Sequence, residues 1–143
     1  MNGSKRSWVA LFGALVLMAA VTAWAGDKQV TASDTPRYDT RAEHVVKAMV
    51  AGIKTHESVQ GYQDMHVILK TTVGDMEVHL GPASYLARRG IVIKPGDEIV
   101  VTGCKTTWED QPVIVARSLK AGTRNLTLRN AKGKPAWPKD LVS

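Results

Sequence analysis

The chain has 143 residues, of which 44% are hydrophobic and 22% charged, and its 19 Lys and Arg outnumber 13 Asp and Glu. This length corresponds to one domain, and the apolar content excludes an intrinsically disordered chain. The single cysteine excludes an intrachain disulfide framework and a cysteine-based zinc site.

The N-terminal residues have the parts of a secretory signal peptide. Lys5 and Arg6 precede an apolar run over residues 8–20, and Ala23-Trp24-Ala25 fits the small-x-small cleavage pattern. The run is short for a membrane span of ~20 residues, although an uncleaved anchor is the alternative. The sequence therefore predicts a signal peptide over residues 1–25 and a periplasmic or secreted protein.

The rest of the chain predicts a leader, a β-domain and a basic extension. Residues 26–40 are polar and lack periodicity, which indicates a flexible leader. A short helix is expected over residues 82–89, because Pro82 suits a first helical position and Gly90 an end. Apolar, alternating and β-branched patterns predict strands over residues 41–57, 65–71, 76–80, 98–103 and 112–119.

The order of these elements predicts an all-β fold. Three strands, a short helix and two further strands match the five-stranded Greek-key barrel of the OB-fold, with the helix between strands three and four. We expect the barrel over residues 41–121 and a basic C-terminal extension over residues 122–143, with a short extra strand over residues 126–129. Another small β-barrel with one helix is the alternative. Gly52, inside the first strand, indicates a β-bulge or a sharp coil of the strand.

Several segments carry a resemblance to known proteins: residues 79–86, 94–97, 99–103, 113–117, 126–129 and 133–137. They resemble a group of secreted bacterial OB-fold proteins, over nearly all of the chain that follows the predicted signal peptide. More distantly, the chain is similar to the periplasmic bacterial OB-fold stress-tolerance family. The resemblance implies the fold and the periplasmic location, and it implies no catalytic residues.

The hairpin over residues 65–80 contains four candidate metal ligands: Met65, His66, Met76 and His79. Thioether sulfur and imidazole suit Cu(I), and a Met/His set on neighbouring strands resembles that of the periplasmic copper-binding OB-fold chaperones. If Thr71 pairs with Asp75, the two histidines point to opposite faces, and no tryptophan of the hairpin packs against the metal. We expect no cofactor, with Met76 in the core and both histidines on the surface or rim; a copper site is the alternative.

The C-terminal part of the chain predicts a binding surface. Residues 115–143 contain seven basic residues and one acidic residue, a balance that favours anionic partners. Trp108, in an expected loop over residues 104–111, is a typical anchor for a partner, although it could instead cover the barrel end. The predicted surface consists of Trp108, Arg117, Lys120, Arg124 and Arg129.

These patterns predict a non-enzymatic binding module. No serine lies in a Gly-x-Ser-x-Gly context, and no histidines have metalloprotease spacing. We expect a protein, a cell-envelope component or a small anionic ligand as the partner. Nucleic acid is an alternative, but it needs aromatic platforms that strands two and three lack, and secretion argues against it. Cys104 is expected to be buried and inert; pairing between molecules or cofactor binding are its alternatives.

Overall fold

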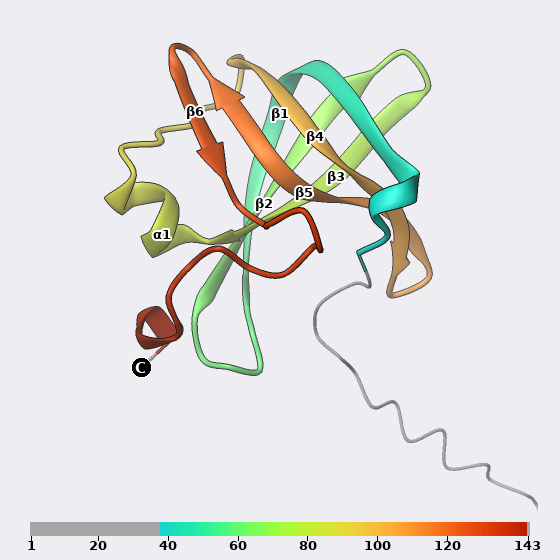
Figure 1. Ribbon diagram of the computed structural model, residues 1–143. Coiled ribbons are helices and arrows are strands. Elements are labelled where there is room, and N and C mark those ends of the chain that lie inside the picture. The colour runs from blue at the N-terminus through green and yellow to red at the C-terminus, as the bar shows by residue number, and fades with distance from the viewer. Residues whose placement is uncertain (1–37, 143) are drawn as a thin grey trace, which may run out of the picture. The chain divides into compact units, whose positions relative to one another are not determined.

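The computed structural model describes residues 38–142. The predicted signal peptide and the leader up to residue 37 therefore lie outside the described residues. The described chain contains six strands, one α-helix and two short 3₁₀ helices (Figure 1). They are η1 (Thr40–Ala42), β1 (Glu43–Glu57), β2 (Gln63–Thr71), β3 (Gly74–Pro82), α1 (Ala83–Arg88), β4 (Glu98–Trp108), β5 (Gln111–Ala121), β6 (Arg124–Thr127) and η2 (Lys139–Val142).

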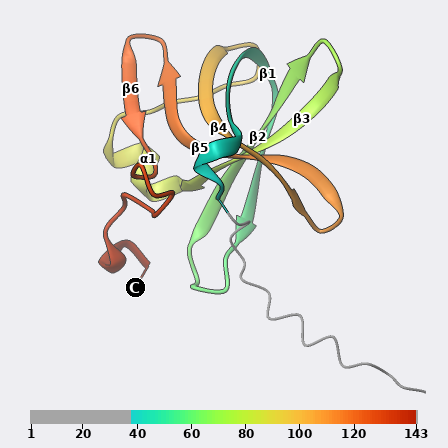
Figure 2. The same ribbon diagram turned by 45° about the vertical axis from the view of Figure 1, so that its right-hand side comes forward.

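The strands form one closed sheet. The strand order is β3-β2-β1-β4-β5-β6, and a parallel pairing of β3 with β5 joins the first strand of this order to the fifth (Figure 2). The remaining neighbours are antiparallel. Five strands thus form a barrel, and α1 lies between β3 and β4 in the chain, which confirms the predicted OB-fold. Within residues 38–142, no helix has the length and apolar character needed to cross a membrane.

Alternation along the strands separates a core face from an outer face. On β2, Val67 and Leu69 are buried in the core cluster, and on β3 Val78 and Leu80 join them. Successive side chains of a strand point to opposite sides of the sheet. Residues 66, 77 and 79 therefore lie on the outer side of the barrel wall. Tyr85 and Leu86 of α1 are buried against the core, as the sequence predicts.

Two β-bulges set the register of the first three strands. The expected bulge at Gly52 is confirmed, because the β1–β2 pairing shifts between Val50 and Gly52. A second bulge, between Met65 and His66, was not expected. The expected pairing of residue 71 with residue 75 is wrong, because Thr71 pairs with Gly74. The register set by this turn changes which residues of the hairpin face each other.

The fourth and fifth strands are longer than the sequence suggests. In place of the expected loop over residues 104–111, β4 continues to Trp108 and β5 begins at Gln111. The turn consists of Glu109 and Asp110, with φ of 48° and 60°. Two successive residues at positive φ are the geometry of a tight hairpin turn that follows the twist of the strands. Trp108 therefore belongs to a strand end.

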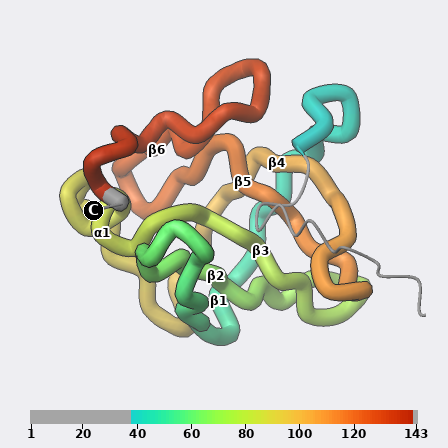
Figure 3. Tube along the Cα trace, turned by 90° about the horizontal axis from the view of Figure 1, so that it is seen from below, coloured from blue at the N-terminus to red at the C-terminus, as the bar shows by residue number. Residues whose placement is uncertain are grey.

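The C-terminal extension completes the core. β6 begins two residues earlier than expected and pairs with β5, while Leu126, Leu128 and Trp137 join the core cluster. Figure 3 shows this segment running beside α1, where the rings of Tyr85 and Trp137 lie 6.1 Å apart. At the other end of the described chain, Tyr38 of the expected leader donates a 2.6 Å hydrogen bond to Glu43.

Candidate functional site

The strand register brings three of the chain's four histidines together on the outer face of the barrel. His56 lies on β1, His66 on β2 and His79 on β3. His66 pairs directly with His79, and its other neighbour across the sheet is Lys54, two residues before His56. The turn that pairs Thr71 with Gly74 produces the first pairing, because the β2–β3 register runs without interruption from that turn to His66. The expectation that His66 and His79 point to opposite faces is therefore wrong.

The three imidazoles form a stack with His66 in the middle. Its ring centroid lies 3.6 Å from that of His79, with an interplanar angle of 18°, and 4.5 Å from that of His56. His66 and His79 are almost fully buried, whereas the His56 side chain is 42% exposed. We call these three residues, with Asp64 and Glu77, the histidine cluster.

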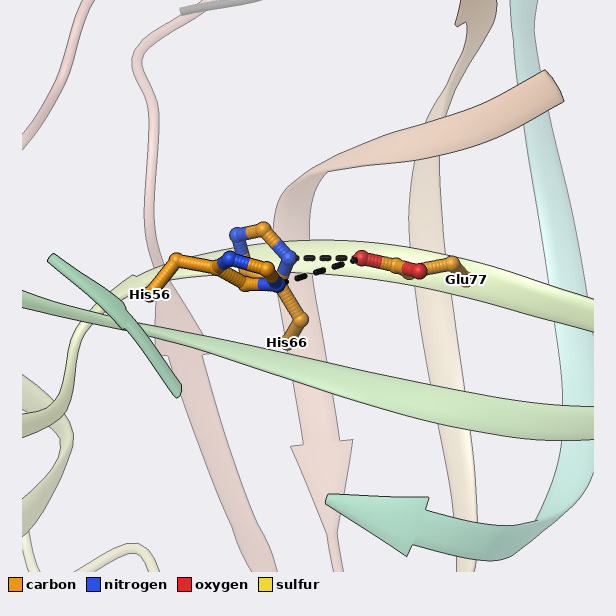
Figure 4. A group of neighbouring side chains, drawn as sticks. All are labelled: His56, His66 and Glu77. Carbon is orange, nitrogen blue, oxygen red and sulfur yellow. Dashed lines mark hydrogen bonds and ion pairs between the residues drawn. The ribbon is translucent and has the colours of Figure 1, made fainter. Parts of the chain in front are cut away.

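One carboxylate oxygen lies close to all three rings. Oε1 of Glu77 is 2.7 Å from Nδ1 of His66, 3.6 Å from Nε2 of His79 and 4.0 Å from Nε2 of His56. Figure 4 shows Glu77 facing the edges of His56 and His66. Two ligands of a tetrahedral zinc ion lie roughly 3.3 Å apart. Within the histidine cluster, two triplets have ligand atoms that all lie within 4.8 Å of one another: His56, His66 and Glu77, and Asp64, His66 and His79.

The second carboxylate holds the opposite edge of His66. Nε2 of His66 lies 3.2 Å from Oδ2 of Asp64. Burial lowers the pKa of His66, but hydrogen bonds to Asp64 and Glu77 and the charges of these carboxylates outweigh burial and raise that pKa above its ordinary value. The pKa of Glu77 is lowered, because the hydrogen bond from His66 and the charge of Lys54 outweigh its own burial. His66 thus shares a positive charge with two carboxylates.

His79 is neutral and lacks a hydrogen-bond partner at its buried nitrogen, Nε2. Burial and the nearby positive charge of His66 lower the pKa of His79 to about 4. A neutral imidazole has one nitrogen with a free lone pair, so His79 offers a metal ligand that costs no proton at neutral pH.

Trp108 closes one side of the histidine cluster. Its ring centroid lies 5.4 Å from His56, 5.6 Å from His66 and 4.9 Å from His79, nearly perpendicular to all three rings. The tight β4–β5 turn brings this half-buried side chain onto the β2–β3 face. The β2–β3 face and the β4–β5 loop are where OB-folds bind ligands. The aromatic group that the hairpin itself lacks is therefore supplied by β4.

The two predicted methionine ligands lie elsewhere. Met65 and Met76 are partly buried and pack against the core cluster. The structure thus brings together His66 and His79 of the four candidate metal ligands and places the two thioethers on the core side. Cys104 is buried, as expected.

The five residues of the predicted binding surface do not form one patch. Trp108 and Lys120 lie near opposite ends of the β4–β5 pair, where Trp108 pairs with Gln111 and Lys120 with Val100. Arg117 donates a 3.1 Å hydrogen bond to Glu43, and Arg124 lies at the β5–β6 turn beside Gly90. Arg129 is 4% exposed, with its guanidinium 5.1 Å from the Trp137 ring.

Sequence reasoning missed His56, Asp64 and Glu77 as members of the site. His56 lies two residues after Lys54 on β1, so the two side chains are on the same face of the strand. Its place on the outer face therefore follows once the bulge at Gly52 fixes the β1–β2 register. Glu77 and His79 alternate with core residues on one strand, and that pattern already placed both on one outer face.

A comparison with protein families identifies the chain. The MamS/MamX magnetosome protein family matches residues 43–126, more than half of the chain. The chain belongs to this family. The match runs from the first residue of β1 into β6, so it includes the whole histidine cluster and Trp108. The comparison with curated proteins finds no match.

Solved structures with similar folds are distant in sequence. A chain of the Schizosaccharomyces pombe Stn1–Ten1 complex matches at 14% identity and a TM-score of 0.46, over 57% of this chain and 59% of that chain. The second OB-fold domain of replication protein A from Methanococcus maripaludis matches at 19% identity and a TM-score of 0.43, over 59% and 87% of the two chains. This chain thus spans less than two thirds of the first of these structures.

Proposed function

We propose that this protein is a binding module whose histidine cluster holds a divalent transition-metal ion. The observation that carries the proposal is the position of Glu77 Oε1, which lies within 4.0 Å of a nitrogen of each of three imidazoles from neighbouring strands. His66, His79, His56 and Glu77 are the proposed ligands. The unpaired Nε2 of His79 supports the proposal, because a buried polar atom without a partner is costly unless something binds it.

The second carboxylate supports the same assignment. If Nδ1 of His66 binds the metal, its other nitrogen donates to Asp64, 3.2 Å away. Metal-binding histidines commonly donate their second nitrogen to a carboxylate, which fixes the ring and its tautomer. The ion would replace the positive charge that His66 now shares with the two carboxylates.

The donor set indicates the class of metal. Imidazole suits zinc, copper, nickel and iron, whereas thioether sulfur selects Cu(I). Because Met65 and Met76 pack against the core, the copper interpretation changes from a Cu(I) site with sulfur ligands to a Cu(II) or Zn(II) site with nitrogen and oxygen ligands. A non-enzymatic role and export to the periplasm remain part of the proposal.

Metal titration tests this function directly. Full-length protein stripped with a chelator is titrated with Zn(II) and Cu(II), and affinity and stoichiometry are measured by calorimetry and native mass spectrometry. We expect one ion per chain and a loss of at least tenfold in affinity for His79→Asn and Glu77→Gln, because each removes one donor. Paramagnetic Cu(II) should quench the fluorescence of Trp108, and Trp108→Phe should abolish that quenching while the ion still binds.

The chain offers a matched control for the histidine variants. His44 lies exposed on β1, outside the histidine cluster. His44→Asn should bind the metal like the wild type. If the wild type binds neither ion, or if the His44 and His79 variants lose affinity equally, the histidine cluster is not the metal site.

A further inference from the structure

The histidine cluster is closed on one side and open on the other. The side chains of His66 and His79 are 2% and 4% exposed, whereas those of Glu77 and His56 are 20% and 42% exposed. The open side adjoins a pocket of about 500 Å³. Its lining comes from β1, β2, β3 and the start of β5: Lys54, Ile68, Asp75, Glu77, Gln111 and Pro112.

Glu77 connects the pocket to the proposed metal position. Its Oε1 lies among the three imidazoles, while its Oε2 lies 3.4 Å from Nζ of Lys54, which also lines the pocket. A metal ion bound to Glu77 would therefore sit at the wall of the pocket. Closed structural metal sites surround the ion with protein ligands, whereas open sites leave a position for a water molecule or a substrate.

The metal ion itself favours an anion in the open position. A divalent ion and Lys54 balance the charges of Glu77, Asp64 and Asp75, since the imidazoles that bind a metal are neutral. Lys54 and Asp75 both line the pocket and both are exposed, so solvent and salt screen both charges. The direct bond to the ion, at a position that otherwise holds water, is therefore the main attraction for a small anion.

We propose that the metal ion keeps one coordination position open toward this pocket and binds a small anion there, with Lys54 as the counter-charge. This inference rests on the proposed metal-binding function. Four protein donors leave a further position on a tetragonal Cu(II) ion, and the pocket provides the path by which an anion displaces water from it.

Azide is the probe for this open position. The Cu(II)-loaded full-length protein is titrated with sodium azide, and the azide-to-copper charge-transfer band is followed by absorption, with electron paramagnetic resonance as a second readout. We expect a saturable band from the wild type. Lys54→Met should weaken azide binding about two- to fivefold, the effect of one partly exposed charge, without loss of copper.

A second lysine of β1 provides the matched control. Lys47 forms an exposed ion pair with Glu98 at 3.1 Å, comparable to the pair of Lys54 with Glu77, but it is not in the pocket lining. Lys47→Met should bind azide like the wild type. If copper binds but azide produces no band, the site is closed and the inference is overturned while the proposed function stands. Equal weakening in both lysine variants overturns the role of Lys54, and a protein that binds neither copper nor zinc overturns both proposals.

Discussion

Two regions of the molecule bury a nitrogen without a hydrogen-bond partner, and the difference between them is chemical. In the histidine cluster this atom is Nε2 of His79; in the C-terminal segment it is Nε of Arg129, beside Trp137. Burial lowers the pKa of both residues. An imidazole nitrogen can offer a lone pair to a metal, whereas a guanidinium is a donor and has no acceptor. The histidine cluster is therefore suited to bind a cation, whereas Arg129 and Trp137 pack the C-terminal segment against the barrel.

The largest expected effect is the loss of stability when the tryptophan of each region is replaced by alanine. Trp137 is 9% exposed, belongs to the core cluster and packs so closely on Gly81 that a Cβ there would lie 2.7 Å from its ring. Trp137→Ala should lower the free energy of unfolding by about 3–5 kcal/mol, measured by urea denaturation. Trp108→Ala should cost about half as much, because Trp108 is half-buried. Equal losses would show that Trp108 is as much a part of the structural core as Trp137.

The next effect is the stabilisation by a bound metal, which should depend on His79 and not on Arg129. A metal at one hundred times its dissociation constant should raise the free energy of unfolding by about 2.7 kcal/mol, because it binds the folded state. His79→Asn should lose this increase. Arg129→Ala should lower the stability of the metal-free protein and keep the increase, measured by thermal denaturation with and without Zn(II). An Arg129 variant without the increase would mean that the C-terminal segment shapes the histidine cluster.

Much of the fold could be predicted from local patterns. Alternation in residues 76–80 predicts β3 with its core face, Pro82 and Gly90 delimit the short helix, and Gly52 marks a bulge. Each of these signals is local, because a side-chain period or a special backbone angle constrains the residues that carry it. The order of the elements then restricts the topology to few barrels.

The histidine cluster could not be predicted from local sequence patterns, because its geometry depends on strand register and turn type. The β2–β3 turn pairs Thr71 with Gly74 in place of Asp75, and a one-residue shift of register changes which side chains of the two strands face each other. The turn at Glu109 and Asp110 has positive φ without glycine or asparagine, so the sequence suggested a loop in place of a hairpin. Arginine is almost never fully buried unless paired, which is why Arg129 was expected on the surface.

The smallest effect concerns a charged pair outside both regions. Glu43 accepts hydrogen bonds from Arg117 and from Tyr38, and the Arg117 bond is the larger cause of its lowered pKa. A carboxyl whose pKa is lower in the folded state stabilises the protein above its unfolded pKa, and this contribution is lost as the pH falls through the folded value. Because both side chains are partly exposed, we expect a contribution of about 1 kcal/mol.

Urea denaturation between pH 7 and pH 3 measures this contribution. Glu43→Gln should be less stable than the wild type at pH 7, and the difference should shrink as the pH falls below about 4.3, the ordinary pKa of a glutamate. Glu98→Gln is the control, because the Lys47–Glu98 pair is largely exposed, and it should change stability at pH 7 by less than about 0.5 kcal/mol. A difference for Glu43→Gln that stays constant from pH 7 to pH 3 would show that Glu43 acts through packing, because a charge contribution must disappear once the carboxylate is protonated.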